Sequence, residues 1–198
     1  MNAVWTIAKK EISDARKNKL FLILLVMLII LTVVSISLGT YQVGVQVRDY
    51  QASVAFLKSI GKTNLPAMPN LNPIAASKNF VNYIGMLGAL LAITLGNNAI
   101  VKEQRGGTLK LILSRKVFKD LFLNGKLLGN LILLAGITFM CAVITFAGTV
   151  TMGNISLTGA ETARMLLFFL MSFLYMAFFL VLGIAMAVFV GNGNRALL

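Results

Sequence analysis

Four long runs of apolar residues set the pattern of this chain, at residues 20–40, 79–101, 127–150 and 165–190. None of the four contains Asp, Glu, Lys or Arg. A helix of about 20 apolar residues crosses the hydrocarbon core of a bilayer, and a helix satisfies its own backbone polar groups in lipid. We therefore predict an all-α fold, a polytopic transmembrane helix bundle that forms one domain over residues 1–198.

A different periodicity precedes the first run. Apolar residues recur there on one helical face, and charged residues fill the rest. This pattern predicts an amphipathic helix over residues 2–18 that lies in the membrane interface; a solvated basic tail is the alternative. The apolar face consists of Val4, Ile7, Ala8, Ile12 and Ala15, and the charged remainder of Lys9, Lys10, Glu11, Asp14, Arg16 and Lys17. The expected interfacial anchors are Trp5, Lys9, Lys10, Arg16 and Lys17.

The segment between the first two runs, residues 41–78, is predicted to be an extracytoplasmic loop. Its first part favours a continuation of the first helix to residue 60, because apolar side chains recur at spacings of three or four. All three prolines fall within residues 63–73, which indicates a non-helical turn region. The apolar repeat consists of Val43, Val47, Tyr50, Val54 and Leu57.

Charge is clustered beside the apolar runs. Residues 1–19 carry five basic and two acidic side chains, and residues 102–126 carry seven basic and two acidic ones. The positive-inside rule places both segments on the cytoplasmic side of the cell membrane, with residues 41–78 and 151–164 outside. The rule also accounts for the net charge of +12. The lipid bilayer is therefore an expected partner and nucleic acid is not.

Side chains suited to catalysis or metal binding are scarce. The sequence has no histidine and one cysteine, Cys141, inside an apolar run. No G-x-x-x-x-G-K-[ST] motif occurs, so we expect the chain not to bind ATP by itself and not to be an enzyme. We assign no catalytic residue, no metal ligand and no cofactor. The uncharged spans also argue against an ion-coupled carrier, whose charged side chains lie within the membrane.

The cationic segment 102–126 contains a glycine break and a short apolar stripe. Gly106 and Gly107 can end the helix that continues from the second run, and Thr108 is a suitable N-cap for another. The pattern fits two alternatives equally: an element that presents a side to a soluble partner, and a surface loop anchored to lipid headgroups. The stripe consists of Leu109, Ile112 and Leu113.

Small and amide side chains near this segment leave further alternatives. Gly125 and Gly129 are spaced for close helix packing, or are glycines at a crowded bend. Asn97 and Asn98 either form hydrogen bonds between helices or lie at headgroup level.

Two stretches resemble the permease subunits of ABC-2 type transporters, in the group that includes the nitrous oxide reductase maturation permease. One is the run E-x-x-G-G-T-L-x-L-x-L-S from Glu103 to Ser114, with Gly-Lys-Leu-Leu-Gly at residues 125–129. The other is IAKKEISDARKNK, from Ile7 to Lys19. In layout the resemblance covers nearly the whole chain.

The resemblance implies a partner and a role for each stretch. Residues 2–18 are similar to an elbow helix, and residues 103–116 to a coupling region that docks on a cytosolic ABC ATPase subunit. The implied docking residues are Glu103, Gly106, Gly107, Thr108, Leu109, Ile112 and Leu113, with Glu103 as a polar contact or a helix-orienting residue. A second permease copy, identical or related, and export of an unidentified substrate are also implied. The alternative function is a membrane anchor or scaffold that recruits a cytosolic protein.

The sequence departs from the family pattern at two points. Lys116 stands where members often have a proline, so the turn near Val117 is expected to be looser. Family permeases usually have six spans, and this sequence predicts four. We therefore expect two further spans beyond Leu198; the alternative is that a partner supplies them.

Overall fold

The computed structural model describes residues 3–62, 66–67, 78–106, 119–153 and 158–190, and the regular structure among them is helical. This confirms the predicted all-α fold. The elements are α1 (Ala3–Lys17), α2 (Lys19–Ser59), α4 (Lys78–Tyr83), the π-helical turn η1 (Ile84–Gly88), α5 (Ala89–Arg105), α7 (Lys119–Gly153) and α8 (Gly159–Val190). Four helical stretches are long and apolar enough to cross a membrane, namely Lys19–Ser59, Phe80–Arg105, Leu121–Thr151 and Gly159–Phe189.

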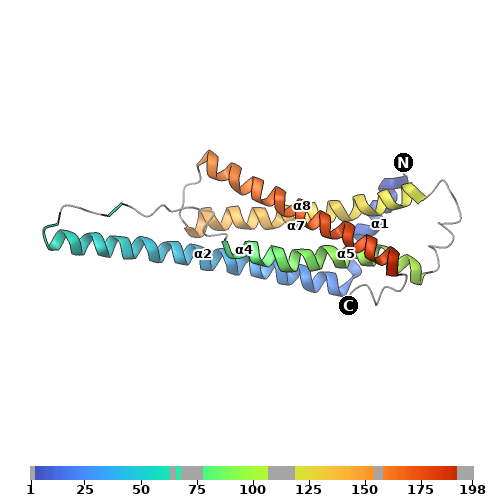
Figure 1. Cartoon of the computed structure of the whole chain (residues 1–198), viewed down its shortest axis with the longest axis horizontal. Coiled ribbons are helices and arrows are strands. Elements are labelled where there is room, and N and C mark those ends of the chain that lie inside the picture. Colours follow the sequence, from blue (N-terminus) through green and yellow to red (C-terminus); the bar gives the residue numbers. More distant parts are fainter. Residues whose placement is uncertain (1–2, 63–65, 68–77, 107–118, 154–157, 191–198) are drawn as a thin grey trace.

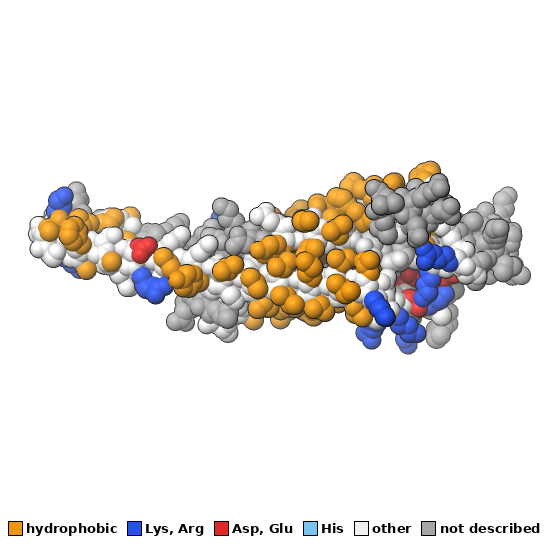
Figure 2. Space-filling view, turned by 90° about the horizontal axis from the view of Figure 1, so that it is seen from below, with side chains coloured by type: hydrophobic (Ala, Val, Ile, Leu, Met, Phe, Trp, Pro, Cys, Tyr) orange, Lys and Arg blue, Asp and Glu red, His pale blue; other side chains and the backbone are white. Residues whose placement is uncertain are grey.

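The four long stretches form an elongated bundle, with α1 beside the first turns of α7 (Figure 1). One fully buried leucine from each stretch belongs to the core: Leu28, Leu91, Leu134 and Leu180. Many other apolar side chains point outward and form a broad hydrophobic band in the middle of the molecule (Figure 2). An apolar exterior around an apolar core is what a helix bundle in lipid requires.

Helix α2 is much longer than a membrane span. Its 41 residues measure about 60 Å at about 1.5 Å per residue, twice the thickness of a hydrocarbon core of about 30 Å. The predicted continuation of the first helix is confirmed, since α2 ends at Ser59. Its far part projects beyond the other helices (Figure 1).

Helices α5 and α8 cross where two glycines let their backbones meet. A Cβ atom at Gly183 would lie 2.6 Å from the carbonyl oxygen of Ile93, and one at Gly96 would lie 2.9 Å from the backbone nitrogen of Ile184. Neither position has room for a side chain. Small residues of this kind allow close helix packing inside membranes, where the hydrophobic effect adds little between helices.

The second predicted span contains a π-helical turn. At η1 the i to i−4 hydrogen-bond pattern is widened, which leaves backbone groups in need of other partners. Tyr175 of α8 donates a hydrogen bond of 2.8 Å from its hydroxyl to the carbonyl oxygen of Gly85. The neighbouring helix thus supplies a partner at the irregular turn.

Candidate functional site

The two cationic segments of the sequence meet at one end of the bundle. Helix α1 packs against α7, and ion pairs join α1 to the last turns of α5. Basic side chains gather at this end, beside the hydrophobic band (Figure 2). Residues 3–19 and the two described flanks of residues 107–118 therefore lie at the same end of the bundle. Two segments on one side of a membrane must have this arrangement.

Helix α1 lies in a shallow groove on α7 that two glycines create. A Cβ atom at Gly125 would lie 2.8 Å from the Cβ of Ile7, and one at Gly129 would lie 2.8 Å from the carbonyl oxygen of Ala8. Ala8 is fully buried. Of the two interpretations of this glycine pair, close helix packing is the one that the structure supports.

A buried lysine next to these glycines joins three helices. Lys126 of α7 donates from Nζ to Glu11 of α1 at 2.5 Å and to Glu103 of α5 at 3.4 Å. The three side chains are 2%, 8% and 9% exposed, respectively. An ammonium group so far out of water is tolerated when carboxylates compensate it closely.

Further contacts complete this cluster. The Nζ of Lys126 lies 4.9 Å from the centre of the Phe122 ring, a cation–π distance. The side-chain amide of Asn130 donates to the carbonyl oxygen of Lys126 at 2.9 Å. Lys10 donates to Glu103 at 3.0 Å from the exposed side. This hydrogen bond raises the pKa of Lys10 above its usual value.

A second ion pair links the same two elements closer to solvent. Lys102 of α5 lies 2.7 Å from the carboxylate of Asp14 of α1. Its lysine side chain is 58% exposed, so the pair contributes little free energy by itself. We call Lys10, Glu11, Asp14, Lys102, Glu103 and Lys126 the charge cluster.

Two members of the charge cluster correct the sequence-based interpretation. Glu11 was assigned to the charged face of α1 and Lys126 to the basic loop, yet both are buried. Glu11 lies between Ala8 and Ala15 on the face that packs against the bundle. The Gly125–Gly129 spacing is the sequence feature that could have revealed this burial. A helix packed on these two glycines would also exclude water from the adjacent Lys126.

The predicted docking residues divide between the described and undescribed parts of the chain. Helix α5 ends at Arg105, and the backbone N–H of Gly106 donates to the backbone carbonyl oxygen of Lys102 at 3.0 Å. Glu103 is buried in the charge cluster, where it contacts Lys10 and Lys126. Gly107, Thr108, Leu109, Ile112 and Leu113 lie outside the described residues, as do Lys116, Val117 and the segment 191–198. Their roles stay predictions.

The predicted interfacial anchors lie on α1 as the periodicity indicated. Trp5 is 55% exposed, and Lys9, Arg16 and Lys17 are exposed. Lys10 is exposed as well, and its ammonium group also contacts Glu103. Contact of the anchors with lipid stays a prediction.

Fold and site together define a multi-pass helical membrane protein whose N-terminal helix is tied by ion pairs to both described flanks of residues 107–118. Residues 5–198 of the chain match the sequence model of the family described as ABC-2 family transporter protein. The chain belongs to this family, and it is a transmembrane permease subunit of the ABC transporter class.

Two curated relatives carry the name probable ABC transporter permease protein NosY. The protein from Stutzerimonas stutzeri is 32% identical over 150 residues, which is 74% of this chain and 46% of the relative. The protein from Pseudomonas aeruginosa is 30% identical over 135 residues, 68% of this chain and 41% of the relative. The matched part therefore spans less than half the length of these relatives. The resemblance inferred from the two sequence stretches is confirmed at the level of the family.

Proposed function

We propose that this permease subunit takes its driving force from a separate cytosolic ABC ATPase, which docks on residues 103–116. Hydrolysis occurs in the ATPase, and the permease converts the motion of its partner into movement of the membrane helices. Export of an unidentified substrate, a dimer of permeases and a cytoplasmic position for α1 and the docking segment are parts of the same proposal.

The charge cluster is the observation that carries this proposal. Glu103 precedes residues 107–118 and Lys126 follows them, and the two side chains contact each other and α1. Because the two flanks contact each other, a displacement of the docking segment would reach α5 and α7 together.

Rigid packing supports transmission along the bundle. The close approach at Gly96 and Gly183 ties α5 to α8, and the groove at Gly125 and Gly129 ties α7 to α1. Interfaces of this kind move as discrete packed units rather than deforming continuously. A push on the docking segment would therefore reach the bundle as a tilt of whole helices.

Co-purification with the cognate ATPase tests the docking assignment. Leu109, Ile112 and Leu113 are each changed to Asp, and each variant is co-expressed with a tagged ATPase. We expect recovery of the permease to fall about tenfold or more, because a charge would be buried in an apolar contact. The matched control is Phe56→Asp, at an exposed site on the far part of α2.

Two results would count against the proposal. If the three leucine and isoleucine variants still co-purify as well as the control does, the docking segment is wrongly assigned. If the ATPase binds but its hydrolysis rate is unchanged by the reconstituted permease, the chain is an anchor and does not transport.

A further inference from the structure

The second predicted span consists of two helices that are joined by the π-helical turn η1. Its first part, α4, packs against α2, whereas its second part, α5, packs mainly against α8. The span therefore changes its neighbouring helix at Ile84–Gly88. A π-helical turn contains one residue more than the α-helical turn that it replaces, and helices commonly bend at such turns.

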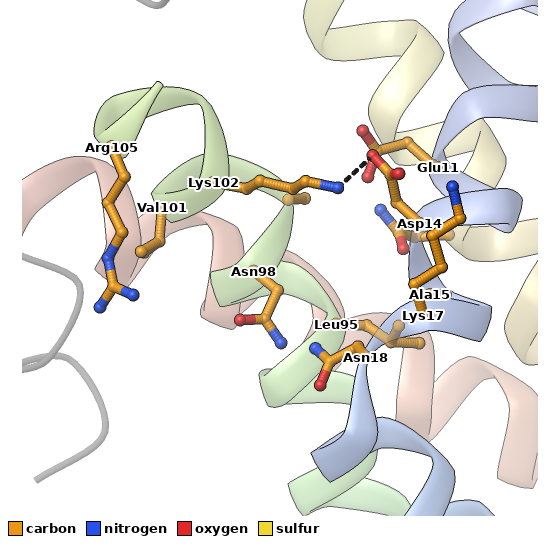
Figure 3. A pocket seen from close by; sticks show the side chains of 12 residues that line it. Glu11, Asp14, Ala15, Lys17, Asn18, Leu95, Asn98, Val101, Lys102 and Arg105 are labelled. Atoms are coloured by element: carbon orange, nitrogen blue, oxygen red, sulfur yellow. Dashed lines mark ion pairs between the residues drawn. The ribbon is translucent and has the colours of Figure 1, made fainter. Parts of the chain in front are cut away.

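The α5 part of the span is fixed at two places. Its backbone meets that of α8 at Gly96 and Gly183. At the end with the charge cluster, Lys102 pairs with Asp14 of α1 at 2.7 Å, and Figure 3 shows this ion pair between the two helices. A close contact between two backbones leaves little freedom for one helix to move against the other.

The α4 part of the span contacts α8 through aromatic side chains. Phe80 is fully buried, and the centre of its ring lies 6.1 Å from that of Phe168 and 5.7 Å from that of Phe169. The first ring pair is T-shaped and the second is tilted. Aromatic pairs are favourable in several orientations, so these contacts persist when one helix shifts slightly. Helix α4 therefore has more freedom than α5 to move against α8.

The turn itself is open on one side. It buries Ile84 and Leu87, but Met86 is 71% exposed. A Cβ atom at Gly85 would meet nothing within 4 Å, so packing does not confine the turn at this position. The hydrogen bond from the Tyr175 hydroxyl to the Gly85 carbonyl oxygen connects the turn to α8.

We propose that η1 is a hinge at which α4 changes its angle to α5, and that the hydrogen bond from Tyr175 to Gly85 latches this hinge. Bending at η1 moves α4 and the part of α2 that it contacts, while α5 stays packed on α8. The proposal concerns motion within the chain and does not rest on docking of an ATPase.

Distances between spin labels test the hinge in the purified protein. Cys141→Ala removes the one cysteine of the chain, and cysteines for labelling are then introduced at exposed positions. Val81→Cys of α4 with Phe189→Cys of α8 spans the hinge, and Leu90→Cys of α5 with Phe189→Cys is the control pair. Both pairs share the label on α8. We expect the first distance distribution to be about twice as wide as the second.

Two variants change the hinge in opposite directions. Tyr175→Phe removes the latch, so it should widen the Val81–Phe189 distribution without changing that of the control pair. Deletion of Met86 turns η1 into an α-helical turn and leaves the flanking helices in phase. It should therefore narrow the Val81–Phe189 distribution to the width of the control distribution.

Deletion of Leu90 is the matched control for deletion of Met86. Both residues are exposed on the same span, but removal of one residue from the regular helix α5 rotates α4 by about 100° relative to α5. We expect the unfolding temperature to fall strongly without Leu90 and to stay close to that of the native protein without Met86.

Equal widths of the two distributions in the native protein would overturn the proposal. An unchanged Val81–Phe189 distribution in Tyr175→Phe, or after deletion of Met86, would overturn it as well. So would a loss of stability on deletion of Met86 as large as that on deletion of Leu90, because the extra residue would then be required for packing.

Discussion

Lys126 of α7 contacts Glu11 of α1 at 2.5 Å, although 115 residues separate them in the chain. Both side chains are almost completely buried. The contact makes the N-terminal helix a structural part of the bundle, in addition to any role as a membrane anchor. Glu11 and Lys126 lie beside the contact of Gly125 and Gly129 with α1, where apolar side chains would be expected. Their opposite charges compensate each other there.

Removal of the buried ammonium group should destabilise the protein strongly. We expect Lys126→Met to reduce the free energy of unfolding by about 3–5 kcal/mol, because the buried carboxylate of Glu11 would lose its lysine partner and Glu103 would keep only the lysine on its exposed side, Lys10. Thermal unfolding in detergent measures the loss. Lys58→Met, at an exposed position in the last turn of α2, is the control and should change little.

A double variant separates lost pairing from lost packing. Glu11→Gln combined with Lys126→Met removes one charge of each sign, so it should cost less than the sum of the two single changes. Strict additivity would mean that the contact between these two residues does not stabilise the fold.

Gly→Ala substitutions on α7 should have opposite signs at two positions. Gly129→Ala places a Cβ atom 2.8 Å from the Ala8 carbonyl oxygen and should destabilise the contact with α1. Gly136→Ala meets open space on the same helix and should stabilise by about 0.5–1 kcal/mol through helix propensity. The unfolding temperatures of the two variants test this prediction. An increase at both positions would show that α1 does not pack closely against Gly129.

The tyrosine at the π-helical turn should matter more than an exposed one. Tyr175→Phe removes the donor to the Gly85 carbonyl and should cost about 1 kcal/mol. Tyr41→Phe, at a 65% exposed position on α2, is the comparison. Equal unfolding temperatures for the two variants would show that the turn does not depend on this hydrogen bond.

The link between Lys10 and Glu103 predicts a pH dependence at the alkaline end. The hydrogen bond to Glu103 raises the pKa of Lys10 above its ordinary value of 10.5. The stability that this bond gives the folded state is therefore complete below pH 10.5 and is lost as pH rises through the raised pKa. The contribution should not exceed about 1 kcal/mol, since the lysine is largely exposed. The free energies of unfolding of wild type and Lys10→Gln, measured across pH, should therefore differ slightly at neutral pH and become equal above the raised pKa.

The single tryptophan reports on the position of α1 in the membrane. Trp5 is the one tryptophan of the chain, so its fluorescence is unambiguous. Lipids brominated near the headgroup should quench it more than lipids brominated deep in the acyl chains, because an indole favours the interface. Strong quenching by the deep bromines, or none by either lipid, would contradict the interfacial position of α1.

Long helices were predictable because their signal is local. Three of the apolar runs each lie within one helix, and the second extends over α4, η1 and α5. The repeat from Val43 to Leu57 correctly indicated that α2 continues beyond its span. The π-helical turn at Ile84–Gly88 had no such signal, since its stability depends in part on Tyr175, a residue of another helix.

The sequence by itself determined the all-α class, the four apolar stretches, the amphipathic N-terminal helix and the family resemblance. Apolar length, helical period and short motifs are properties of neighbouring residues, so they can be recognised before folding is known. Only the tertiary structure decided that Glu11 and Lys126 are buried partners and that Gly129 receives α1 rather than forming a bend. The burial of a charge depends on which distant groups surround it, and helical periodicity contains no information about a partner 115 residues away.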